Sequence, residues 1–153
     1  MAGLKLKITS GEVATVNGVK TLLQIKAAAN QRVVIRGIRI FGKDLTTTTN
    51  APVKIRMTRS TSAFGSSASS VGVIAKNDPS DAETIQTTVT SNFNSEPTSP
   101  TDAGLWWELQ PQTLLEEFYG PGEEIKIPGG QSLQFEVTAG AVSTMVISVD
   151  AEE

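Results

Sequence analysis

The strongest constraint in the sequence is a two-residue alternation of apolar and polar side chains that recurs along the chain. It is clearest in APVKIRMTRS (51–60), QSLQFEVTA (131–139) and STMVISVDAEE (143–153). Because successive side chains of a β-strand point to opposite faces, this period is typical of strands with one buried face. Helical periodicity is nearly absent, and the run AAA at 27–29 is too short to form a helix. The sequence therefore predicts an all-β protein.

The chain has 153 residues, an ordinary size for a single domain, and neither a linker nor a repeat divides it. About eight antiparallel strands can be counted between residues 21 and 153, which favours a sandwich of the jelly-roll type. Residues 1–20 precede this domain. We expect them to form an N-terminal arm or one added strand.

The segment VVIRGIRI breaks the alternation in an informative way. Val33 and Ile35 share one face, but the next apolar pair, Ile38 and Ile40, is displaced by one position. A β-bulge at Gly37 would absorb the extra residue and keep all four apolar side chains inward. We therefore predict one long, bulged strand here.

A second glycine-containing element, Pro128-Gly129-Gly130, could be a ligand-binding loop or a turn. A phosphate-binding loop needs glycines followed by a helix N-terminus, which supplies the aimed N–H groups. Here an alternating strand follows instead. We predict a corner at which the chain turns from one sheet to the other.

The composition excludes several kinds of catalytic site. The chain has no Cys and no His, so a Ser-His-Asp or Cys-His arrangement and a thiolate metal site cannot be built. The acidic pairs 116–117 and 123–124 point to opposite faces of a strand, so neither pair converges on one substrate. Asp78 and Asp81 are usual turn residues. We expect no enzyme, no metal and no cofactor.

The charged residues are unevenly distributed, although the net charge is only −3. Eleven of the 13 basic residues lie between Lys5 and Arg59, and 14 of the 16 carboxylates lie at or after Asp78. One interpretation is that the basic N-terminal part of the chain binds nucleic acid. The other is that basic and acidic strands become neighbours in the fold, which we favour because the basic residues are spaced along strands. The N-terminus has no long apolar run, so we expect a soluble chain made in a cytoplasm.

Two segments share an order of strands and turns with a known family. They are TLLQIKAAANQRVVIRGIRIFGKD (21–44) and WWELQPQTLLEEFYGPGEEIKIPGGQSLQFEVTAGAVSTMVISVDAEE (106–153). The second contains a Trp-bearing strand, then Leu114-Leu115-Glu116 as a hairpin, the Pro-Gly-Gly corner and two alternating strands. This order resembles that of small bacteriophage capsid decoration (cement) proteins with a jelly-roll fold. The likeness covers about residues 21–153, and the adjacent pair of Trp residues has no assigned place in the family pattern.

This resemblance implies a non-enzymatic virion protein, made in the host cytoplasm and located on the outer capsid surface. It implies a homotrimer that clamps neighbouring subunits of the major capsid protein, with no direct contact to nucleic acid or membrane. A ligand that binds the assembled lattice and not the free subunits stabilises the lattice by mass action.

The candidate partner-binding residues lie in two places. The first is an alternating N-terminal segment that we expect to pair with another chain or to pack as an edge strand: Leu4, Lys5, Leu6, Lys7 and Ile8. Deletion of residues 1–9 should then weaken capsid binding without unfolding the body. The second is Trp106, which alternation places on the outer face because Leu105, Trp107 and Leu109 take the buried face.

An exposed Trp106 also suits a different class of protein. Aromatic rings stack on sugars, so a carbohydrate-binding or host-attachment module, such as a tail-fibre or baseplate component, is the alternative function. A single Trp suits a protein interface at least as well, and the sequence leaves both open.

The jelly-roll rule also predicts which strands are neighbours. With eight strands numbered from residue 21, the second (31–41) should lie beside the seventh (132–138). The third (52–58) should lie between the eighth (143–150) and the sixth (114–119). Basic and acidic strands would then alternate. Arg32, Arg36 or Arg39 would lie near Glu136, and Lys54 or Arg56 would lie near Asp150, Glu116 or Glu117.

Overall fold

The computed structural model describes residues 3–43, 52–61, 64–67, 72–98, 100–110 and 113–153. In these residues it contains fourteen β-strands and no helix, and so no helix that could cross a membrane. Sheet A comprises, in spatial order, β11 (Leu114–Phe118), β4 (Val33–Gly42), β14 (Thr144–Glu152), β1 (Lys5–Thr9) and β7 (Val73–Lys76), with β12 (Ile125–Ile127) beside β4 and β2 (Val13–Ala14) beside β14. Sheet B comprises β10 (Thr101–Leu109), β5 (Val53–Ser60), β13 (Ser132–Ala139), β3 (Gly18–Lys26) and β8 (Thr88–Ser91), and β6 (Ser66–Ser67) pairs with β9 (Phe93–Ser95).

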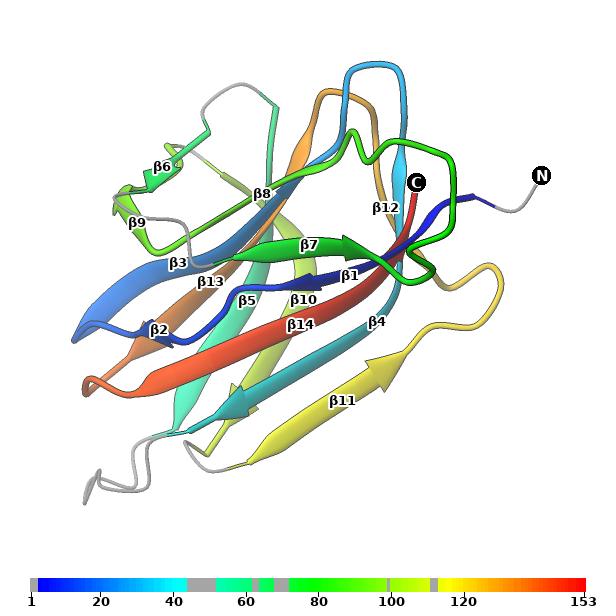
Figure 1. Ribbon diagram of the computed structural model, residues 1–153. Helices are drawn as coiled ribbons and strands as arrows, with labels where there is room; N and C mark the ends of the chain where they lie inside the picture. The colour runs from blue at the N-terminus through cyan, green and yellow to red at the C-terminus, as the bar shows by residue number, and fades with distance from the viewer. Residues whose placement is uncertain (1–2, 44–51, 62–63, 68–71, 99, 111–112) are drawn as a thin grey trace.

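The two large sheets are made by one long antiparallel hairpin that wraps around the core (Figure 1). Its ladder pairs are β5 with β10, β4 with β11, β3 with β13, and β1 with β14. When this hairpin wraps around the core, β4 also pairs with β14, and β5 also pairs with β13. This is the strand order of a jelly-roll sandwich. β7 and β8 come from the segment between β5 and β10, and each adds one strand to one sheet.

The core lies between the sheets and is filled by the inward half of each alternating strand. Its largest fully buried side chains come from both sheets: Phe135, Leu6, Ile8, Leu22, Leu23, Ile25, Ile35, Ile38, Ile40, Ile55, Met57 and Ile127. Burial of this apolar surface is the main driving force for the fold. The predicted all-β sandwich is therefore confirmed.

The predicted bulge and the predicted corner are both present. Along β4, Asp150 pairs with Gly37 and Ala151 with Ile35, so Arg36 is the extra residue. The Pro128–Gly130 turn joins β12 of sheet A to β13 of sheet B. A Cβ atom at Gly129 would lie 2.5 Å from the carbonyl oxygen of Ala29, and Gly130 has a φ of 75°, so both positions favour glycine.

The N-terminal segment is an internal strand and not an arm. β1 lies between β14 and β7, with residue pairs such as Lys7 with Asp150 and Ile8 with Val149. Leu4, Leu6 and Ile8 are each 2% exposed and belong to the core. The expectation that these three side chains contact a partner is therefore corrected, because they are already buried within their own chain.

The predicted strand neighbours were wrong, although the charge complementarity was right. β4 lies beside β14 and β11 instead of β13, and β5 lies between β10 and β13. The carboxylate partners are exchanged accordingly. Arg39 pairs with Glu116 and Asp150, and Arg56 pairs with Glu136. Leu114-Leu115-Glu116 lies within β11 and not in a hairpin.

Deletion of residues 1–9 should prevent folding, which reverses the expectation from sequence. It removes β1, leaves β7 without its partner, and removes three buried side chains that are each worth about 2–5 kcal/mol, against a typical total stability of about 5–15 kcal/mol. Circular dichroism should show no cooperative unfolding transition. The Lys5→Ala/Lys7→Ala variant, whose changed side chains point outward, should retain the transition; a folded deletion variant would contradict the central place of β1.

Candidate functional site

The exposed members of the predicted partner-binding set lie on opposite sides of the sandwich. Lys5 and Lys7 point outward from sheet A, whereas Trp106 points outward from sheet B, where it pairs with Arg56 and is 55% exposed. The alternation predicted the outward direction of Trp106 correctly. The structure does not bring the three residues together into one site.

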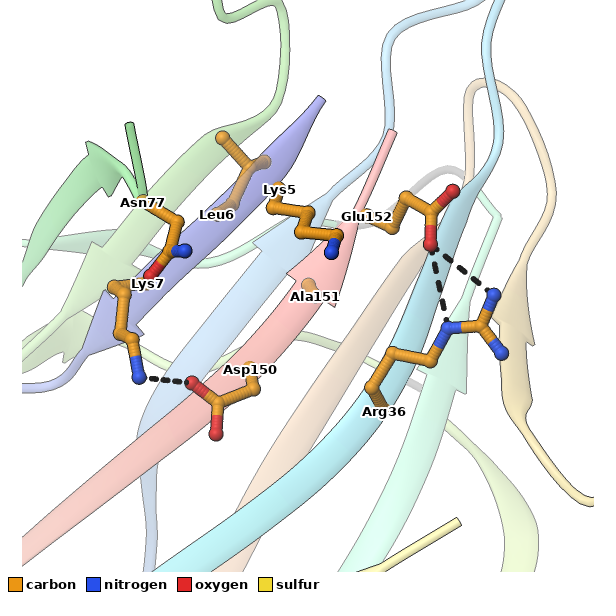
Figure 2. Close-up of a pocket in the computed structure, with 8 residues that line it drawn as sticks. All are labelled: Lys5, Leu6, Lys7, Arg36, Asn77, Asp150, Ala151 and Glu152. Carbon is orange, nitrogen blue, oxygen red and sulfur yellow. Dashed lines mark hydrogen bonds and ion pairs between the residues drawn. The ribbon is translucent and has the colours of Figure 1, made fainter. Parts of the chain in front are cut away.

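Lys5 and Lys7 line a hollow of about 450 Å³ on the outer face of sheet A (Figure 2). The lining comes from β1, β14, the bulge of β4 and the residue after β7: Lys5, Leu6, Lys7, Arg36, Asn77, Asp150, Ala151 and Glu152. It holds three cationic and two anionic side chains. The sequence predicted Arg36 beside Glu136, and it missed the place of Arg36 in this hollow because it paired 31–41 with the wrong strand.

An ion-pair row crosses the sheet beside the hollow. Lys7 Nζ lies 2.9 Å from Asp150 Oδ1, and Arg39 lies 2.9 Å from both Asp150 Oδ2 and Glu116 Oε1. The row therefore runs from β1 through β14 and β4 to β11, with alternating signs of charge. Exposed pairs of this kind contribute about 0–1 kcal/mol each, so the row favours register more than stability.

Arg36 forms a second charged cluster at the end of β14. Its Nη2 lies 3.1 Å from Glu152 Oε2, and its Nη1 pairs with Glu124. Partial burial raises the pKa of Glu152, but the hydrogen bonds from Arg36 and Gly3 and the charges of Arg36 and Lys5 outweigh it, so the pKa falls below its usual value. Backbone N–H groups, then Arg36, lower the pKa of Glu124. Among the described residues, none forms an ion pair with Lys5 (Figure 2).

The acidic residues that could suggest a metal site have other partners. Asp78 Oδ1 accepts hydrogen bonds from the N–H and hydroxyl of Ser80, which close a turn and lower the pKa of Asp78. Asp150 and Glu152 pair with cationic side chains. The described part of the chain contains no cluster of three or more acidic residues placed to hold a metal ion.

An apolar patch adjoins the ion-pair row on the same outer face. It consists of Phe41, Leu114 and Phe118, which are 37%, 57% and 61% exposed, and we call it the β4–β11 patch. The Phe118 ring lies on Gly37, where a Cβ atom would be 2.7 Å from the ring, and the Arg39 guanidinium lies 5.0 Å from the ring centroid. The ring of Phe118 can therefore pack on the sheet because Gly37 has no side chain to displace it, and the cationic Arg39 side chain lies next to the ring.

Sequence reasoning missed this patch for a physical reason. In LLEEF, both faces of the strand mix apolar and acidic residues, so the alternation does not identify an apolar face. The patch arises only when Leu114 pairs with Phe41 and Phe118 with Gly37 across two strands. The predicted pairing, with 114–119 beside 52–58, hid that contact.

A hydrogen-bonded cluster links the two sheets at the β10 and β11 edges. Trp107 Nε1 donates to Glu117 Oε1 at 2.6 Å, and the Tyr119 hydroxyl donates to Glu117 Oε2 at 2.8 Å. All three side chains are half-buried. Burial, and then the hydrogen bond to Glu117, raise the pKa of Tyr119 far above its usual value.

Comparisons with known proteins identify no family. No protein-family model matches the sequence, and no curated protein matches it. A Yersinia pseudotuberculosis-derived mitogen has a TM-score of 0.32 and 9% identity over 95% of this chain and 84% of its own. A structure of infectious bursal disease virus, Gx strain, has a TM-score of 0.24 and 13% identity over 99% of this chain but only 41% of the viral chain. Likeness this weak supports no argument about function, and the jelly-roll description rests on the strand order.

The two adjacent Trp residues should respond differently to truncation. Trp107→Ala removes a half-buried ring and its hydrogen bond to Glu117, so we expect a loss of about 3 kcal/mol, near the lower end for a buried aromatic. Trp106→Ala removes an exposed ring and should change stability by less than about 0.5 kcal/mol. Urea unfolding monitored by circular dichroism measures both; equal losses would show that the rings do not face as described.

The Arg36 cluster should make stability depend on pH. A carboxylate whose pKa is lower in the folded chain contributes stability that is present above its unfolded pKa and is lost as the pH falls through its folded pKa. We therefore expect the melting temperature to decrease once the pH drops below about 4.5, which is the ordinary pKa of the Glu124 and Glu152 carboxyl groups. In the Arg36→Gln variant the decrease in melting temperature should be shallower, because Arg36 no longer lowers the pKa values of Glu124 and Glu152. Parallel pH profiles for the two proteins would contradict the role of Arg36.

Proposed function

We propose that this chain is a non-enzymatic structural protein of a virion, a bacteriophage capsid decoration protein that binds the outer surface of the assembled shell. Two things support the proposal: the resemblance of residues 21–153 to that family, and the β4–β11 patch. The patch is the structural observation that carries it. Its partner would be the major capsid protein, and its location would be the outer capsid surface after synthesis in the host cytoplasm.

The patch has the properties of a protein-binding surface. Its three large apolar side chains stand on two paired strands, with Phe41 and Leu114 on one side of the Arg39–Glu116 ion pair and Phe118 on the other. Interfaces commonly combine exposed apolar and aromatic side chains with Arg, which is a frequent energetic centre, and here Arg39 lies between the apolar side chains. Because paired strands hold these side chains, docking would require little rearrangement.

The charge arrangement supports a protein partner over nucleic acid. The basic strands β1 and β4 alternate with acidic partners on β14 and β11, so the outer face of sheet A is not a continuous basic surface. Nucleic-acid affinity depends on uncompensated cations that contact phosphates.

Binding to a lattice supplies the stabilising mechanism. A protein that binds assembled subunits, and not free ones, shifts the equilibrium toward the assembled shell. We propose that the chain acts as a homotrimer, because three linked copies bind with avidity and can clamp several subunits together.

The test is co-sedimentation of the purified protein with intact virions and with expanded empty shells. The wild-type chain should migrate with the shells. The Leu114→Ala/Phe118→Ala variant should lose at least about 2 kcal/mol, or roughly thirtyfold in affinity, if these residues are at the centre of the interface. Val142→Ala, which removes a 58% exposed apolar side chain outside the patch, is the matched control and should bind normally.

Two results would count against the proposal. One is a wild-type chain that stays in the supernatant with both kinds of particle. The other is equal binding by the patch variant and the control, which would show that another surface makes the contact. Light scattering of the free protein separately tests the trimer, and a stable dimer both free and bound would contradict it.

A further inference from the structure

The outer face of sheet B carries a second constellation, on the opposite side of the sandwich from the β4–β11 patch. Trp106 on β10 pairs across the ladder with Arg56 on β5, and Arg56 pairs with Glu136 on β13. The three side chains therefore form a row at right angles to the strands, which we call the Trp106 row. Adjacent strands are about 4.8 Å apart, so the row spans about 10 Å.

The members of the Trp106 row hold one another in place. The Arg56 guanidinium lies 5.5 Å from the centroid of the Trp106 ring, and Arg56 Nε donates to Glu136 Oε1. The side chain of Glu136 is only 9% exposed, so its orientation is fixed by the sheet. Cation–π contact and the charged hydrogen bond together restrict the guanidinium to one position.

Polar groups in the row still have unused hydrogen-bonding capacity. Neither Nη atom of Arg56, nor Oε2 of Glu136, forms a hydrogen bond with a described residue. Trp106 is 55% exposed, which leaves a large part of its ring open to solvent. The row therefore combines one open aromatic surface with the part-exposed Arg56 guanidinium beside it and the largely buried Glu136 carboxylate on the next strand.

The surroundings of the row differ from those of the β4–β11 patch. The neighbouring residues across the ladder are exposed. From β10 to β13 they are polar, with Glu108 opposite Lys54 and Lys54 opposite Thr138, and the exposed apolar Val19 follows only on β3, three strands from Trp106. A single aromatic ring among charged and hydroxyl groups lacks the contiguous apolar centre of a protein interface. It matches the chemistry of a sugar, because the C–H face of a pyranose packs on an aromatic ring while its hydroxyls bond to planar charged groups.

We infer that the Trp106 row binds a neutral glycan, with one pyranose on Trp106 and hydroxyls of the same or the next sugar on Arg56 and Glu136. The carboxylates Asp102, Glu108 and Glu136 outnumber the cations Lys54 and Arg56, which disfavours an anionic sugar. The row is about as long as a disaccharide. Because sheets A and B face opposite ways, glycan binding on sheet B is compatible with docking through sheet A and does not depend on it.

Affinity electrophoresis of the free protein, without any shells, tests this inference. The gels contain one soluble neutral polysaccharide each (β-glucan, α-mannan, galactan, xylan or dextran), with alginate as the anionic comparison. We expect at least one neutral polymer to retard the wild-type chain. Trp106→Ala should weaken that binding by at least about tenfold, and Glu136→Gln should weaken it less. Phe118→Ala, an equally exposed aromatic on sheet A, is the matched control and should bind as the wild type does.

Three results would overturn the inference. They are no retardation by any neutral polymer, retardation by alginate alone, and retardation that Trp106→Ala leaves unchanged. Co-sedimentation of the same variants separates this site from the proposed function. Trp106→Ala should retain shell binding, whereas Leu114→Ala/Phe118→Ala should lose shell binding and keep glycan binding. A loss of shell binding in Trp106→Ala with no loss of glycan binding would identify Trp106 as a protein contact instead.

Discussion

The pairing of β1 with β14 is the constraint on which the rest of the structure depends. It is the last rung of the wrapped hairpin, and it joins the two ends of the chain: Leu4 N–H donates to Glu153 O at 2.9 Å, and Glu153 N–H donates to Leu4 O at 3.0 Å. Among the described strands of sheet A, β7 pairs with β1 alone. The charged hollow and the ion-pair row cross this same junction. Because the paired strands are separated by nearly the whole chain, their contact carries a loop-closure cost, which the buried side chains of β1 offset.

The comparison of sequence and structure shows what alternation can and cannot specify. A period of two identifies the buried face of a strand, and it placed Leu133, Phe135 and Val137 inward correctly. It contains no information about which strand lies next to which. That depends on the position of each strand along the wrapped hairpin, so omission of the first strand displaced every predicted neighbour by one. The count of about eight strands after residue 21 therefore did not include β1 (Lys5–Thr9).

The sequence predicts the candidate surfaces less completely than it predicts the buried faces of the strands. The outward directions of Lys5, Lys7 and Trp106 follow from alternation within one strand. The β4–β11 patch and the Trp106 row each combine side chains from different strands, so they exist only once register is set. The bulge at Arg36 is a special case: VVIRGIRI predicted its location, but not that the extra residue would extend toward Glu152 and Glu124.

The inward carboxylate Glu117 has a consequence for how copies of this chain behave when crowded together. It lies on β11, the outermost strand of sheet A, and is held by Trp107 of β10, the outermost strand of sheet B. A strand from another molecule that extended sheet A would seal this charge away from water, and inward-pointing charges on edge strands oppose such growth. The register shift between Asp102 and Trp106 interrupts the neighbouring edge of β10 in the same way. At the β11 edge this charge therefore opposes association of crowded copies through shared backbone hydrogen bonds.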